Sequence, residues 1–194
     1  PHYRPAGNNV NIADNQFVWP ARVNPGVNRG YQPNILRDGK LKEFTAANSQ
    51  FIYRGDLLPK DFYGNAFVCE PSGNLVRRNM MFATNGTLRA SNAYDHAELL
   101  ASTDERFRPV NLTSGPDGAL YIVDFYRGVL QHRISLTTYL RKQGEDRGLE
   151  KPLHLGRIYR IVPEGKKVRN EPPAFAQETP AQWVDSLSHP NGWH

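Results

Sequence analysis

Short apolar runs separated by turn residues dominate the middle of the chain. Four of these runs are Ala66–Cys69, Leu75–Phe82, Arg108–Thr113 and Ala119–Asp124. Runs of this length are typical of strands, because a helix of a globular protein usually needs about ten residues or more. The pair Asn85-Gly86 between two apolar runs is a strong signal for a hairpin turn. The pattern therefore predicts antiparallel strands joined by tight turns.

A fifth run, Arg157–Val162, alternates apolar and polar residues, which indicates a strand with one face in solvent. In Ala119–Asp124 the alternation is hidden because both faces are apolar, as expected for a strand between two neighbours. Groups of short strands with Gly and Asp turns are typical of β-propeller blades. We therefore expect an all-β fold that forms part of a β-propeller.

Two longer segments interrupt this rhythm. Residues 91–105 are polar, and we expect a helical turn there before the next strand. Residues 129–155 contain a short helical pattern over Ser135–Lys142, followed by a charged loop. Loops of this length on a compact domain are more often functional than idle.

The composition changes after Pro163, where a stretch rich in Lys, Pro and Glu begins. Further on, Thr179 precedes Pro180 and a short apolar pattern that reaches Leu187, which predicts a capped helix. We therefore divide the chain into propeller blades (1–163), a linker (164–178) and the start of a helical region (179–194). The helix is expected to pack beside the propeller. We also expect the sequence to be the C-terminal piece of a propeller in a longer protein, because it opens without Met and stops within an element.

Charge and cysteine content exclude several classes of function. The chain carries 24 Lys and Arg against 19 Asp and Glu, a net charge of +5, but the basic residues are spread along it. This distribution argues against nucleic-acid binding. The single Cys69 excludes an intrachain disulfide, a cysteine metal site and covalent haem attachment within this segment. No run approaches the roughly 18 apolar residues of a membrane span.

An ordered set of motifs resembles the quinoprotein glucose/sorbosone dehydrogenase family. It comprises Phe107–Val110, Gly115–Tyr121 and Gly156–Ile161. Three further segments resemble a narrower group of large bacterial proteins, common in planctomycetes, that are described as membrane-bound dehydrogenases: Pro25–Gln32, Tyr53–Asp56 and Phe62–Val68. The resemblance covers about residues 20–163.

The resemblance implies a six-bladed propeller followed by helical HEAT-like repeats, whose opening is similar to Leu187–Trp193. It also implies a periplasmic or extracellular, membrane-associated oxidoreductase that acts on a sugar or polyol. Electrons would pass through pyrroloquinoline quinone (PQQ) to a cytochrome. The expected partners are the rest of the same longer chain and a cytochrome c or membrane complex, with haem only in a module outside this segment. The catalytic histidine of the family would lie in an early blade, also outside it.

The same resemblance points to candidate cofactor ligands. Arg106 and Arg108 are similar to an Arg-x-Arg clamp for the quinone tricarboxylate, and residues two apart on a strand share a face. The other candidates are Asn28, Arg29, Tyr126 and Arg127, from a glycine-flanked loop and a strand end. Calcium held by loop carbonyls is compatible with such a site.

Glu70 leaves a second function open. Where quinoprotein glucose dehydrogenases place a cofactor-contacting lysine, Val68–Asn74 contains none, and the carboxylate of Glu70 opposes a tricarboxylate. The alternative is therefore a non-catalytic propeller scaffold or binding subunit of a larger assembly. Two other polar residues receive structural interpretations: Asp117 caps a turn, and His96 is a loop histidine, because it and the adjacent Asp95 are not expected to face each other.

Overall fold

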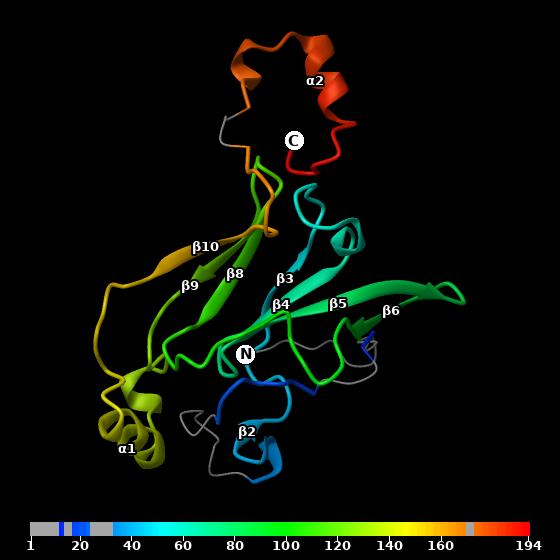
Figure 1. The fold of residues 1–194 in the computed structure, drawn as a ribbon. Helices are drawn as coiled ribbons and strands as arrows, with labels where there is room; N and C mark the ends of the chain where they lie inside the picture. The colour runs from blue at the N-terminus through cyan, green and yellow to red at the C-terminus, as the bar shows by residue number, and fades with distance from the viewer. Residues whose placement is uncertain (1–11, 14–16, 24–32, 170–172) are drawn as a thin grey trace.

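Two antiparallel β-sheets form the body of the molecule (Figure 1). The computed structural model describes residues 12–13, 17–23, 33–169 and 173–194. The larger sheet has the order β3-β4-β5-β6, with β7 also paired to β5, and the smaller has the order β10-β9-β8. The larger sheet comprises β3 (Asn48–Ile52), β4 (Ala66–Glu70), β5 (Leu75–Thr84), β6 (Thr87–Asn92) and β7 (Leu100–Ala101). The smaller comprises β8 (Pro109–Ser114), β9 (Leu120–Asp124) and β10 (Arg157–Ile161).

The remaining elements are short. They are a two-stranded ribbon of β1 (Leu36–Arg37) and β2 (Lys40–Leu41), the helices α1 (Thr138–Asp146) and α2 (Pro180–Ser186), and 3-10 turns at Pro33–Ile35, Lys60–Phe62, Arg133–Ser135 and Phe175–Gln177. All five strands predicted from the apolar runs are confirmed, with ends that differ by one or two residues. The fold of the described residues is mostly β, as expected.

The main core lies between the two sheets. In this core, Phe67 and Val76 of the larger sheet pack with Leu112 and Ile122 of the smaller one. Tyr53, which directly follows β3, belongs to the same core. These side chains are 4% exposed or less, and each contributes roughly 1.5–3 kcal/mol when it is withdrawn from water. The sheets therefore form one packed unit.

The turn between β8 and β9 is tied to this core. The Tyr53 hydroxyl donates to the carbonyl of Gly118 and accepts from the amide of Leu58 at 3.0 Å. Gly118 has φ of 78°, and a Cβ there would meet Asp56 Oδ1 at 2.1 Å, so only glycine fits. Asp117 caps the turn as predicted, because its Oδ1 accepts from the amide of Ala119 at 3.1 Å.

The hairpin between β5 and β6 projects from the body (Figure 1). Asn85 and Gly86 both have positive φ, 50° and 73°, as the Asn-Gly signal predicts. The segment after β6 corrects another expectation: residues 93–99 form bends and irregular loop instead of a helical turn. Here the Asn92 side chain accepts from the amide of Tyr94, and Ala93 donates to the carbonyl of Arg78. The amide of Ala93 thus extends the pairing with β5 beyond the end of β6, and the Asn92 side chain closes a local turn.

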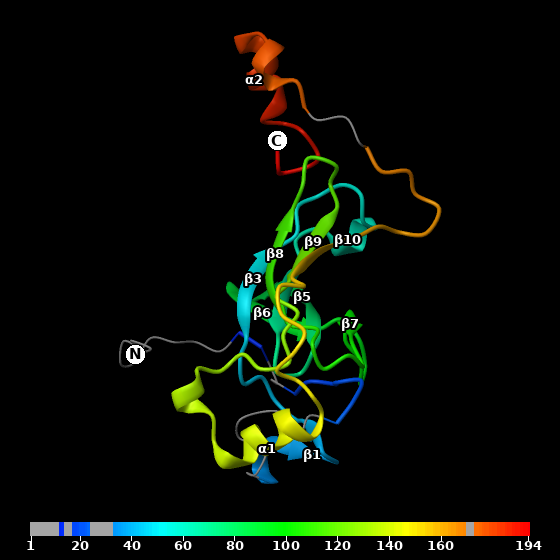
Figure 2. The same cartoon turned by 90° about the vertical axis from the view of Figure 1, so that its left-hand side faces the viewer.

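Both predicted helices are present. Thr137 caps α1, and a complete capping box of Thr179 and Gln182 begins α2. The expectation that α2 packs beside the sheets is wrong, since none of its residues is buried and Trp183 and Val184 are 51% and 64% exposed. Figure 2 shows α2 at one end of the molecule, beyond the β8–β9 turn, and α1 at the other.

The residues that follow α2 contact the body in its place. The buried side chain of Asn191 donates to the carbonyls of Gly115 and Pro116 at 3.0 and 3.2 Å. The amide of Gly192 donates to the carbonyl of Arg54 at 2.7 Å. The C-terminal segment is thus held at the β8–β9 turn, and α2 is a projection whose apolar side chains face solvent.

Candidate functional site

Arg108 lies immediately before β8, with its side chain only 7% exposed. Its guanidinium donates to three backbone carbonyls: Pro71 at 2.6 Å, Arg127 at 2.9 Å and Gly128 at 2.9 Å. Burial lowers the pKa of Arg108 to about 10, so it stays protonated at neutral pH. The side chain therefore joins the β4–β5 turn to the segment that follows β9.

Arg106 is not on the same strand as Arg108. It lies in a turn in which Asp104 Oδ1 accepts from the amide of Arg106 at 2.9 Å. Its guanidinium donates to the carbonyls of Gly148 and Lys151, each at 2.9 Å, beyond the end of α1. The premise that a shared strand aligns the two arginines is wrong, because the Asp104 turn separates them and each guanidinium meets a different set of carbonyls. Their role as cofactor ligands stays a prediction.

Tyr126 and Arg127 follow β9, and the carbonyl of Arg127 accepts a hydrogen bond from the Arg108 guanidinium. Tyr126 has φ of 47°, and the guanidinium of Arg157 lies 3.6 Å from the centre of its ring. Arg127 lines a hollow of about 220 Å³ together with Glu150. This volume is below the roughly 300–1,000 Å³ typical of small-molecule sites. The candidates Asn28 and Arg29 lie outside the described residues.

Glu70, where the resemblance expects a lysine nearby, closes the β4–β5 turn. Its carboxylate is 0% exposed and accepts from the amides of Thr45 and Ala46, each at 2.8 Å, and of Ser72 at 3.0 Å. Burial raises the pKa of Glu70 above its ordinary value, while these amides act in the opposite direction. The carboxylate thus holds backbone groups together and is not presented to a ligand.

Asp124 at the end of β9 is also fully buried. Its Oδ1 accepts from the amides of Arg108 and Tyr126 at 2.7 and 2.8 Å. Its Oδ2 has no hydrogen-bond partner among the described residues. Burial raises the pKa of Asp124, because the charged form loses its hydration.

Replacing this carboxylate, Asp124→Asn, is expected to flatten the pH dependence of stability. A raised native pKa gives stability that is present below the unfolded pKa of about 3.9 and lost as the pH rises through the native value. Asn retains the acceptor for both amides but does not ionise. Urea unfolding of both proteins between about pH 4 and pH 7 measures the effect. If the free energy of unfolding changed with pH equally in both proteins, ionisation of Asp124 would not destabilise the native state in this range.

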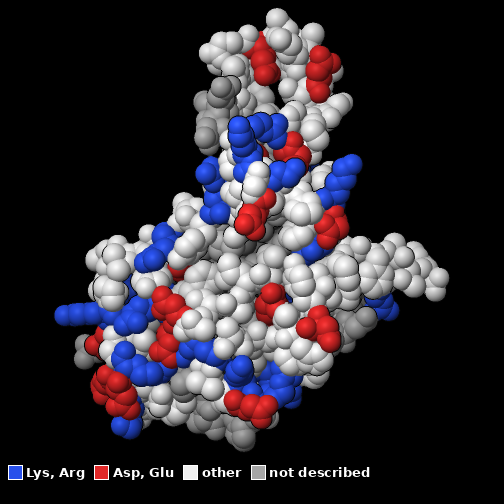
Figure 3. Space-filling view, in the orientation of Figure 1, with Lys and Arg blue, Asp and Glu red and all other residues white. Residues whose placement is uncertain are grey.

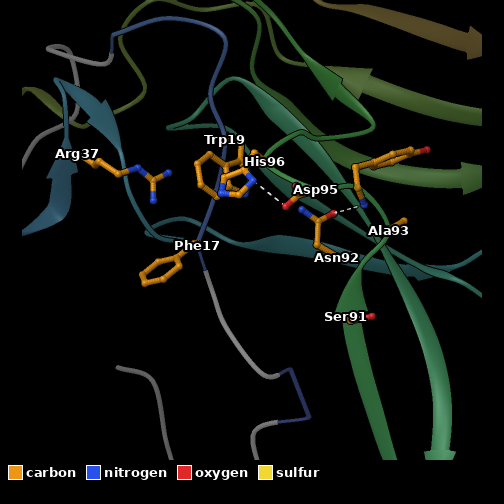
Figure 4. Close-up of a pocket in the computed structure, with 9 residues that line it drawn as sticks. Phe17, Trp19, Arg37, Ser91, Asn92, Ala93, Asp95 and His96 are labelled. Carbon is orange, nitrogen blue, oxygen red and sulfur yellow. Dashed lines mark hydrogen bonds and ion pairs between the residues drawn. The ribbon is translucent and has the colours of Figure 1, made fainter.

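A separate, open pocket of about 590 Å³ lies on the larger sheet (Figure 4). Three parts of the chain line it: the segment with Phe17 and Trp19, Arg37 of β1, and residues 91–96 at the end of β6 and beyond. The Arg37 guanidinium stacks over Trp19, 3.9 Å from the ring centre, and donates to the carbonyl of Val18 at 3.1 Å. Aromatic faces and a cation therefore meet at its wall.

His96 forms the neighbouring wall of this pocket. Its ring meets Trp19 edge to face, with ring centres 4.2 Å apart, and its Nδ1 lies 2.7 Å from Oδ1 of Asp95. His96 is a loop histidine, as predicted, but the expectation that it and Asp95 do not face each other is wrong. The reason is its φ of 51°, which turns two adjacent side chains toward each other.

A comparison with known protein families matches residues 2–165 to a family described as a domain of unknown function, DUF7133. The match spans most of the chain. The chain belongs to the DUF7133 family. No curated protein and no solved structure matches it.

Other features of this DUF7133 chain bear on the class of site. In the described residues there is no group of three or more His, Cys, Asp or Glu side chains that could hold a metal ion. The helices of the described part are all too short to cross a membrane. On the face shown in Figure 3, basic and acidic side chains are interspersed and form no field of a single sign.

The sequence gives little signal for the pocket of this DUF7133 chain. Phe17 and Trp19 stand in one of the few apolar runs near the start of the chain, but Arg37 and the 91–96 segment share no motif with it. The contact between Arg37 and Trp19 joins residues 18 positions apart through a two-stranded ribbon that no strong pattern predicts. Only the length and polarity of the 91–105 insertion indicated a functional loop in this region.

Proposed function

We propose that this chain is a non-catalytic scaffold or binding part of a larger protein, built from consecutive β-propeller blades. The observation that carries the proposal is the engagement of Arg108, whose guanidinium meets three backbone carbonyls in a buried position. An arginine used in this way supports the fold and has little capacity left for a cofactor carboxylate. Glu70, bonded to three backbone amides, supports the same interpretation.

Two antiparallel sheets packed face to face through one core are what two neighbouring blades would present. The outer strand β10 has four exposed residues of five, including Ile158 at 67% exposure. Exposed strand edges with apolar residues favour pairing with further strands. Further blades of the same longer chain are the partner that this edge would accept, and α2 with its exposed Trp183 would begin a helical region.

Titration of the protein with PQQ in the presence of Ca²⁺, followed by absorption spectroscopy, tests the scaffold proposal. We expect no saturable binding at micromolar quinone, because neither Arg106 nor Arg108 offers a free bidentate fork. Arg106→Ala is the informative variant, since Arg106 is partly exposed and its loss leaves the core intact. Stoichiometric PQQ binding that Arg106→Ala weakens about ten-fold or more would instead support the dehydrogenase hypothesis.

A further inference from the structure

The pocket beside Trp19 has the size and rigidity of a ligand site. Its volume of about 590 Å³ falls within the roughly 300–1,000 Å³ of small-molecule sites. The backbone of Trp19 is anchored, because its amide donates to Oε1 of Glu98 at 2.9 Å, and the side chain of Glu98 is itself fully buried in an ion pair with Arg77. The neighbouring Val18 is 0% exposed. The aromatic wall is therefore held in place before any ligand arrives.

Arg37 supplies a positive charge to one side of the pocket. Its contacts are the Trp19 face, the more distant Phe17 ring and the Val18 carbonyl. No ion pair joins it to a carboxylate in the part of the chain that the structure describes. A guanidinium stacked on an aromatic ring keeps the outer N–H groups of its plane for bidentate contact with a carboxylate.

Asp95 and His96 supply hydrogen-bonding groups on another side. Figure 4 shows Arg37 on one side of the Trp19 and His96 rings and Asp95 on the other. The Asp95 and His96 side chains are 93% and 67% exposed, so a ligand can reach them. With Nδ1 of His96 paired to Asp95, the second ring nitrogen and the second carboxylate oxygen of Asp95 are available for hydroxyl groups. The pocket thus has an anion-binding end, an apolar middle and a hydroxyl-binding end.

We propose that this pocket binds a saccharide with a carboxylate group, that is, a uronic acid. Such a sugar ring combines one carboxylate for Arg37, an apolar C–H face for the exposed Phe17 ring, and hydroxyls opposite the carboxylate for Asp95 and His96. The Trp19 ring, which lies against Arg37 and His96, holds these two side chains in place. A simple phosphate would use Arg37 alone. An aromatic carboxylate would use Arg37 and the rings but would leave Asp95 facing an apolar edge. The proposal is independent of the scaffold function, because none of these residues belongs to the Arg108 region.

Calorimetric titration of the full chain with glucuronate, glucose and benzoate tests the proposal. We expect glucuronate to bind saturably, with glucose about ten-fold weaker because it lacks the carboxylate contact. Arg37→Gln keeps a polar N–H donor at this position but is shorter and removes the charge, so it should weaken glucuronate about ten-fold and leave glucose unchanged. Arg89→Ala is the matched control, since Arg89 lies on β6 but does not line the pocket.

A second variant separates binding from folding. Asp95→Asn alters only an exposed side chain and should weaken glucuronate and glucose alike, while the far-UV spectrum stays that of the parent. The proposal is overturned if glucuronate does not bind at up to about 20 mM, or if Arg37→Gln binds it as well as the parent does. Benzoate binding as tight as glucuronate would also overturn it, because the hydroxyl-binding end would then have no role.

Discussion

Replacing Arg108 by Ala is expected to lower the free energy of unfolding by about 3–5 kcal/mol. The substitution leaves the carbonyls of Pro71, Arg127 and Gly128 without their donor in a buried position. A buried polar group without a partner costs about 1–3 kcal/mol, and local rearrangement with water recovers part of the sum. Equilibrium unfolding in guanidinium chloride, followed by circular dichroism, measures the loss.

Two further variants make this result specific. Arg108→Lys keeps a charge but not the planar fork. It should therefore lower the free energy of unfolding by about half as much as Arg108→Ala does. Arg106→Ala is the matched control, because Arg106 also donates to carbonyls but in an exposed setting, and it should change stability by no more than about 0.5 kcal/mol. If Arg108→Ala were as stable as the parent, the structural role of Arg108, and with it the main support for the scaffold proposal, would be lost.

The strands could be predicted because their signals are local. Apolar runs of four to eight residues, the Asn85-Gly86 turn and the Thr179-Pro180 helix start each depend on neighbours in sequence. The mostly β fold follows from them. The helical turn expected within 91–105 is absent, and the amide of Ala93 instead donates to the carbonyl of Arg78 in β5, a contact between distant residues that composition does not reveal.

The roles of the charged residues could not be predicted, since their partners are distant in sequence. Arg108 binds carbonyls at positions 71, 127 and 128, and the Glu70 carboxylate reaches back to Thr45 and Ala46. Spacing alone cannot distinguish an arginine that awaits an anion from one that holds two loops together. The contact of Asp95 with His96 required a positive φ, which a histidine adopts only when its surroundings favour it.

The second large effect is expected at the buried pair of Arg77 and Glu98, whose side chains are 2% and 0% exposed. Arg77 donates through Nε and Nη2 to both carboxylate oxygens of Glu98, and Glu98 also accepts from the amide of Trp19. Arg77→Met leaves this carboxylate buried without its cation, which should cost about 3–5 kcal/mol. The same substitution should weaken the support of Trp19. Without Arg77, the Glu98 carboxylate that accepts from the Trp19 amide is expected to move toward solvent.

The double variant Arg77→Met/Glu98→Gln distinguishes the electrostatic effect of the ion pair from the effect of side-chain packing. Gln keeps an acceptor for the Trp19 amide and carries no charge. The cost of burying an unpaired carboxylate, which Arg77→Met alone incurs, is therefore absent in the double variant. The double variant should therefore be more stable than Arg77→Met alone by about 1–3 kcal/mol, a coupling that a double-mutant cycle with guanidinium unfolding measures. Glucuronate titration of the same proteins gives the functional readout, with Arg77→Met binding more weakly than the double variant. Additive stability losses would mean that the two side chains act independently, and that the anchor of the Trp19 wall is not the ion pair but the surrounding core.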